Sequence, residues 1–148
     1  MRRILAAAAT LGLAGLGVII PASSAQASVA CDNAWAATPS GSIRAYRDIH
    51  CSVILGTDDG SDSNWNDASG AFQGADNDAA SSLVHKGTSG MHARFFVNAG
   101  ETGGYTCLAK AEYYMDSVVG FTFSSGVAVN DNISAHDWVW SCDRFLDS

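Results

Sequence analysis

The 148-residue sequence has few basic residues, and this excludes one large class of partner. It holds 8 lysines and arginines against 15 aspartates and glutamates, giving a formal charge of −7. A surface of this sign repels a phosphate backbone, which nucleic-acid-binding proteins neutralise with clustered basic side chains. We therefore expect no nucleic-acid partner.

The sequence also has only one long apolar run. Arg2 and Arg3 precede this run, which covers 4–20, and a small-x-small cleavage pattern ends at Ala27. No other apolar run approaches the roughly 20 residues that span a bilayer. The pattern predicts a secretory signal peptide over 1–27 and a secreted, extracellular chain with no membrane partner after cleavage. That chain would carry six basic and fifteen acidic side chains, a formal charge of −9.

The four cysteines form no C-x-x-C pair, which argues against a zinc site. All four follow the predicted cleavage site, and an even count in an exported chain predicts two disulfides. Three pairings are possible. Cys31–Cys51 together with Cys107–Cys142 would keep each loop within one half of the chain.

Helix-period stretches are few, while Gly, Ser, Asn and Asp clusters separate short aromatic or β-branched runs. This pattern predicts an all-β sandwich or closed Greek-key barrel. The one short helix we expect covers 110–115. The predicted strands are Ile43–Tyr46, Ser82–His85, Ala93–Val97, Tyr105–Ala109, Val118–Phe123 and Asp137–Trp140.

Catalytic motifs are absent from the sequence as well. The four histidines are isolated from one another, and no G-x-S-x-G run occurs. The nearest run, KGTSGM, has Met91 in place of the second glycine. We therefore expect a protein that is not an enzyme.

What the sequence does contain is a repeated element. NDAASS covers 77–82, and NDNISA follows fifty-three residues later over 130–135. One interpretation is turn chemistry, since Asn, Asp and Ser bond to their own backbone and tolerate left-handed conformations. The other is a cation site, because each element offers a carboxylate, amide oxygens, a hydroxyl and loop carbonyls, which are ligands that Ca²⁺ prefers.

An EF-hand is a third interpretation, suggested by the acidic run DDGSDSNWND. Asp62, Asn64 and Asn66 have the 1-3-5 spacing of that motif. However, Asp67 stands in place of its sixth-position glycine and Gln73 in place of its twelfth-position glutamate. We therefore expect a solvated loop here.

The paired N/D-N/D-x-x-S/T-S elements each follow an aromatic strand and a turn, AYRDIHC in the first half and FFVNAGETGG in the second. This arrangement resembles the βγ-crystallin Greek-key domain, and it is closest to the secreted bacterial I36 peptidase-inhibitor family. The resemblance implies two Greek-key motifs in one domain, stabilised here by two disulfides. The implied parts are an N-terminal extension (28–42) and a domain (43–148) with motifs at about 43–88 and 91–142.

In that family the two elements clamp up to two Ca²⁺ ions by exchanging ligands. The resemblance implies that each copy contributes three side chains and one carbonyl. These are Asn77, Asp78 and Ser81 with the carbonyl of Ala79, and Asn130, Asp131 and Ser134 with the carbonyl of Asn132.

The sequence departs from the family's turn pattern, which is an aromatic residue, four residues, a second aromatic, any residue and a glycine. In the second half Glu101 replaces the second aromatic. In the first half Cys51 and Val53 take the places of the aromatic and the glycine. We expect a disulfide at Cys51 to reshape the first turn.

The family resemblance implies a peptidase inhibitor of the metalloprotease type on a Ca²⁺-binding scaffold. Its partner would be an extracellular protease, and we expect a monomer. The candidate inhibitory segments lie around Cys51–Asp58 and Glu101–Cys107. The alternative is a Ca²⁺-binding structural or stress module without inhibitory activity.

Overall fold

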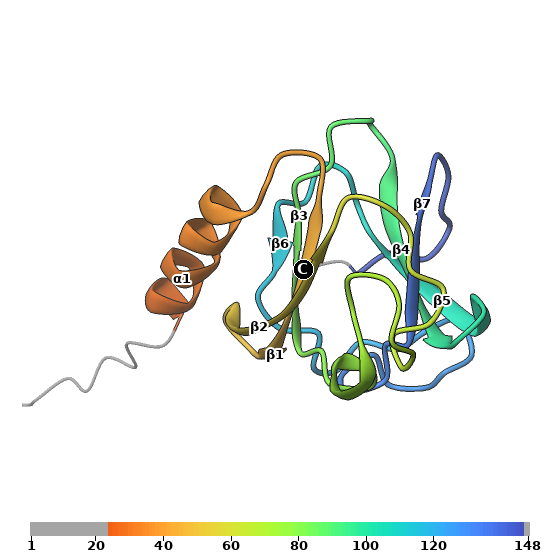
Figure 1. Ribbon diagram of the computed structural model, residues 1–148. Coiled ribbons are helices and arrows are strands. Elements are labelled where there is room, and N and C mark those ends of the chain that lie inside the picture. The colour runs from red at the N-terminus through yellow and green to blue at the C-terminus, as the bar shows by residue number, and fades with distance from the viewer. Residues whose placement is uncertain (1–23, 147–148) are drawn as a thin grey trace, which may run out of the picture.

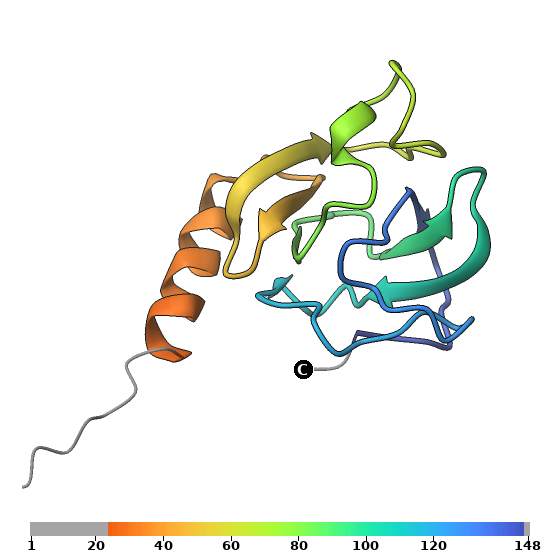
Figure 2. The same ribbon diagram turned by 90° about the horizontal axis from the view of Figure 1, so that it is seen from below.

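The computed structural model describes residues 24–146, which form two antiparallel sheets with one helix beside the first (Figures 1 and 2). Most of the predicted signal peptide, 1–23, lies outside the described residues. The elements are α1 (Ser24–Ala37), β1 (Ile43–Asp48), β2 (Ser52–Asp58), η1 (Gly74–Asp76), β3 (Ser82–His85), β4 (His92–Asn98), β5 (Thr102–Leu108), β6 (Tyr114–Met115) and β7 (Ala135–Val139).

The two motifs exchange segments between the sheets. The strand order is β2-β1-β3-β6 in one sheet and β5-β4-β7 in the other. Motif two supplies β6, whose Met115 pairs with Leu83, and motif one supplies Asp62, which bridges to His136 on β7. Both pairs are related by the same shift of 53 residues. The prediction of an all-β fold with two Greek-key motifs is confirmed.

Five of the six predicted strands are present, with bounds that differ by up to three residues. The sixth, 118–123, is wrong, because Thr122 makes only an isolated bridge to Ala128 there. The helix expected over 110–115 is also wrong, since this segment turns and then becomes β6. The sequence analysis missed α1, β2 and β6.

The core fills the space between the sheets and includes an unexpected aromatic pair. Trp65 and Phe72 are fully buried, with stacked rings whose centroids lie 4.0 Å apart. Both belong to the segment that connects β2 to β3, so the expectation of a solvated loop over 58–67 is wrong. Asp62 in the same segment is 6% exposed, and its carboxylate accepts hydrogen bonds from the backbone N–H groups of Asn64 and Phe72. The two hydrogen bonds of this carboxylate thus hold the backbone of the connection in place.

The two disulfides are those that keep each loop within one half of the chain, Cys31–Cys51 and Cys107–Cys142. The first fastens α1 to the β1–β2 turn. Lys86 also holds α1, because its ammonium donates to the carbonyls at the helix end. The disulfides indicate an oxidising compartment. Within residues 24–146, no helix has the length and apolar character to cross a membrane.

The turns of the two β-hairpins have the same backbone conformation. His50, Cys51 and Val53 have φ of 61°, 55° and 58°. The corresponding residues of the second hairpin, at 100, 101 and 103, have φ of 73°, 59° and 82°. The expectation that the disulfide reshapes the first turn is therefore wrong: the disulfide attaches to a turn with the conformation of its counterpart.

Val53 is strained in this turn, and replacing it should stabilise the protein. A β-branched residue at positive φ is an outlier, and the left-handed region costs an L-residue roughly 1–2 kcal/mol. Val53 is also half exposed, so little packing is lost on substitution. Glycine also adds conformational entropy to the unfolded chain, which offsets part of the gain from relieving the strain. We therefore expect Val53→Gly to raise the free energy of unfolding by about 0.5–1 kcal/mol, measured by urea denaturation.

The reverse change in the second hairpin is the control. A side chain at Gly103 would collide with Asn98 and with Val97. Gly103→Val should therefore destabilise the protein, and a destabilising Val53→Gly would contradict the proposed strain.

Candidate metal site

The fold brings the two repeated elements side by side. The backbone N–H of Asp78 donates to the carbonyl of Ile133 (3.0 Å), and that of Asp131 donates to the carbonyl of Ala80 (3.1 Å). Each element therefore bonds to the other at equivalent positions, as the family resemblance implies.

The side chains of the two elements also cross. The Ser134 hydroxyl donates to Asp78 Oδ1 at 2.9 Å, and the Ser81 hydroxyl lies 3.4 Å from Asp131 Oδ1. Both aspartates are left-handed, with φ of 54° and 56°, and this directs each carboxylate to the serine of the other motif. We call the Asp78–Ser134 pair the first clamp and the Asp131–Ser81 pair the second clamp.

The asparagine before each aspartate completes its clamp. Asn77 Nδ2 donates to Asp78 Oδ2 (2.8 Å), and Asn130 Nδ2 donates to Asp131 Oδ2 (2.7 Å). Asn130 Oδ1 is buried without a hydrogen-bond partner. Because a buried oxygen without a partner is costly, its presence beside a carboxylate fits a cation ligand.

Each clamp has a low negative charge. No group of three or more His, Cys, Asp or Glu side chains suited to a metal occurs within residues 24–146. One carboxylate per clamp means that hydroxyl, amide and carbonyl oxygens must supply most of the ligands, a set suited to Ca²⁺ and to modest affinity. The roles of the carbonyls of Ala79 and Asn132 stay predictions.

The last residue of the first element serves the fold. Ser82 is fully buried; its hydroxyl donates to the carbonyl of Asp48 (2.7 Å) and accepts from the N–H of Cys51 (2.9 Å). It thereby fixes the first hairpin turn to the first element. Ala135 occupies the equivalent place in the second motif, without this hydroxyl.

A buried polar network adjoins the second element, where the N–H of Trp65 donates to the carbonyl of Ser134, and the sequence analysis missed it. Trp65 Nε1 donates to His136 Nδ1 (3.0 Å), so the neutral ring carries its proton on Nε2. That nitrogen lies 3.4 Å from Asp58 Oδ2, a long contact whose attraction is mainly electrostatic. His136 is fully buried and follows the second element directly, which is the only signal the sequence gives.

This network makes stability depend on pH. The contact with His136 lowers the pKa of Asp58, against an opposing effect of burial, and the N–H of Gly60 adds to the lowering. A carboxyl whose pKa is lower in the folded state than in the unfolded state stabilises the folded protein at pH values above its unfolded pKa. This contribution to stability is lost as the pH falls through the folded pKa. We expect Asp58→Asn to lower the free energy of unfolding at pH 7. On acidification below about pH 4, the variant should lose less stability than the wild type.

Urea denaturation between pH 7 and 2.5 measures this dependence. Asp59→Asn changes the exposed neighbour and is the control, expected to follow the wild-type curve. An Asp58→Asn curve parallel to the wild type over this range would contradict the role given to Asp58.

Comparison with known proteins supports the fold assignment. No family model matches the sequence, and no curated protein does. A solved structure described as "Evolution of the eye lens beta-gamma-crystallin domain fold" is similar, with a TM-score of 0.53 and 17% identity, covering 69% of this chain and 89% of its own. The protein therefore has the βγ-crystallin fold, a Greek-key scaffold that here contains two disulfides.

Proposed function

We propose that the protein is a secreted, non-enzymatic Greek-key protein that binds two Ca²⁺ ions, one in each clamp. The observation that carries this proposal is the crossing of the clamps, in which Asp78 meets Ser134 and Asp131 meets Ser81. Turn chemistry alone needs no contact between the two elements, whereas a shared ion does. Ions bound across the two motifs would stabilise their association.

Thermal unfolding of the disulfide-intact protein in chelator and in about 2 mM Ca²⁺ tests this proposal. With a dissociation constant near 10⁻⁴ M, each filled site adds roughly 1.8 kcal/mol by mass action. We expect the midpoint to rise by several degrees per site. Mg²⁺ at the same concentration is the control, since it prefers strict octahedral geometry and releases water reluctantly. Identical midpoints in chelator and Ca²⁺ would leave the repeat as turn chemistry.

Peptidase inhibition is the second candidate function. The segments first considered, 51–58 and 101–107, lie on the edge strands β2 and β5 with the turns before them, and are not free loops. Of these two segments, only the first combines a disulfide anchor at Cys51 with exposed apolar side chains, since Val53 and Ile54 at the start of β2 are 50% and 56% exposed. A segment held rigid in this way loses little entropy on docking, which favours an inhibitor.

A panel of metallo-, serine and cysteine proteases tests the inhibitor proposal. We expect inhibition of a metalloprotease by the folded protein at micromolar concentration, and a loss of inhibition in Ile54→Ser. Val127→Ser, which changes another exposed apolar residue, is the control and should inhibit as the wild type does. If no protease of any class is inhibited, the Ca²⁺-binding module without inhibitory activity is the better account.

A further inference from the structure

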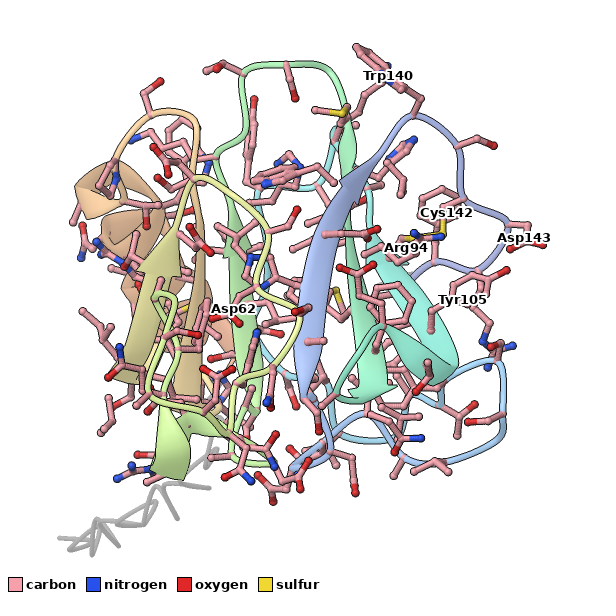
Figure 3. All side chains as sticks on the ribbon, turned by 45° about the vertical axis from the view of Figure 1, so that its right-hand side comes forward. Asp62, Arg94, Tyr105, Trp140, Cys142 and Asp143 are labelled. Atoms are coloured by element: carbon pink, nitrogen blue, oxygen red, sulfur yellow. A yellow bond between two sulfur atoms is a disulfide. The ribbon has the colours of Figure 1, made fainter. Side chains whose placement is uncertain are left out.

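The three tryptophans other than Trp65 gather at one end of the molecule. In Figure 1 the β3–β4 connection lies at this upper end and η1, next to the clamps, lies at the lower end. Trp35, Trp138, Trp140 and Tyr113 surround the β3–β4 connection, and we call these four residues the aromatic face. Figure 3 shows Trp140 at the upper edge, where it is 74% exposed.

Two adjoining pockets run along the aromatic face. The first, of about 240 Å³, is bordered by Trp35 and Tyr113. The second, of about 280 Å³, is bordered by Trp138. Both pockets include Ser40 and Thr88, so they meet at these hydroxyls. An apolar wall with a few polar groups is typical of small-molecule sites, and two joined pockets suit an elongated ligand.

The walls of both pockets are held in place by the fold. Trp35 Nε1 donates to the carbonyl of His85 (3.1 Å), and the Lys86 ammonium lies 4.6 Å from the centroid of the Trp35 ring. The Trp138 ring packs on Gly87, where a Cβ would lie 2.6 Å from it. The rings are therefore positioned before any ligand arrives, which reduces the entropy lost on binding.

The first pocket is positively charged although the protein is acidic. The sequence has only two lysines, Lys86 and Lys110, and both line this pocket. No Asp or Glu is among its lining residues. Lys86 donates three hydrogen bonds to backbone carbonyls, whereas within residues 24–146 no hydrogen bond or ion pair involves the exposed Lys110 ammonium. Lys110 is thus available to an anionic ligand.

We propose that the aromatic face binds a short saccharide chain that carries a carboxylate. An acidic sugar unit would occupy the first pocket, with its carboxylate on Lys110 and its ring over the open side of Tyr113, which is 61% exposed. A neighbouring unit would occupy the second pocket against Trp138, where Ser40, Thr88 and the carboxylate of Asp59 can bond to its hydroxyls. A single aromatic acid would fill the first pocket only, and the net negative charge opposes nucleic acid.

Calorimetric titration of the disulfide-intact protein with trigalacturonate tests this proposal, with maltotriose as the neutral match of the same length. We expect trigalacturonate to bind in the micromolar to millimolar range and maltotriose at least tenfold more weakly. Lys110→Gln should weaken trigalacturonate binding about tenfold by removing a charge-assisted hydrogen bond. Tyr113→Ala should weaken it about three- to tenfold through lost ring contact. Both residues are exposed, so the thermal midpoint should not change and serves as the folding check.

Val127→Ala is the matched surface control and should bind as the wild type does. Four results would overturn the proposal: no trigalacturonate binding at several millimolar, equal binding of maltotriose, binding unchanged by Lys110→Gln and Tyr113→Ala, or benzoate binding as tight as that of the trisaccharide. The clamps lie at the other end of the fold, so this outcome is independent of Ca²⁺ binding.

Discussion

Trp65→Ala should be the most destabilising single substitution outside the cysteines. Truncating a buried tryptophan costs about 3–5 kcal/mol, and Trp65 is fully buried against Phe72. It also donates to His136 Nδ1, which would lose its partner inside the core. Because domains are stable by about 5–15 kcal/mol, this change removes a large share of the total. We expect the thermal midpoint to fall by more than about 10 °C.

Two further tryptophan variants separate the causes of this loss. Trp65→Phe keeps an aromatic ring beside Phe72 but removes the hydrogen bond to His136, so it should cost less than the alanine change. Trp140→Ala alters an exposed ring and should change the free energy of unfolding by less than about 0.5 kcal/mol. If Trp65→Ala were no worse than Trp140→Ala, the connection around Asp62 would not belong to the cooperative core.

The sequence predicted those parts of the fold whose signals are local or repeated. Five of the six aromatic or β-branched runs were correctly predicted as strands, whereas 118–123, which contains the alternating Phe121 and Phe123, forms none. The 53-residue repeat indicated one motif used twice. The strand β2 (Ser52–Asp58) was missed because its apolar residues Val53 and Ile54 are exposed on an edge and do not alternate with buried positions. The polar connection that contains Trp65 was misread because its burial depends on a long-range bridge from Asp62 to His136, which no local pattern encodes.

The contacts between the two repeated elements agree with the family resemblance, while the metal-binding role of their residues stays a prediction. NDAASS and NDNISA identified both aspartates and both serines of the clamps, and the resemblance implied that they would exchange partners. The aromatic face was invisible to sequence reasoning, because Trp35, Tyr113 and Trp138 are far apart in the chain and meet only through the packing of α1 and the two sheets. The shared backbone conformation of the hairpin turns could not be predicted either. Valine disfavours a positive φ and glycine adopts it readily, yet Val53 and Gly103 both have a positive φ.

The central claim, that each ion is held by residues of both motifs, predicts a specific pattern in paired variants. If the clamps are crossed, Asp78→Ala and Ser134→Ala damage the same site, and Asp131→Ala and Ser81→Ala damage the other. The double variant Asp78→Ala/Ser134→Ala should therefore keep one Ca²⁺ site. Asp78→Ala/Ser81→Ala should weaken both sites, and with them up to roughly 3.6 kcal/mol of Ca²⁺-dependent stability at 2 mM.

The most direct test is the Ca²⁺ stoichiometry of these two double variants, measured by calorimetric titration of the disulfide-intact protein. The account predicts one ion bound per molecule by Asp78→Ala/Ser134→Ala and weak or no binding by Asp78→Ala/Ser81→Ala. The opposite pattern, one ion retained by Asp78→Ala/Ser81→Ala and none by Asp78→Ala/Ser134→Ala, would show that each motif binds its ion alone and would contradict the crossed clamps.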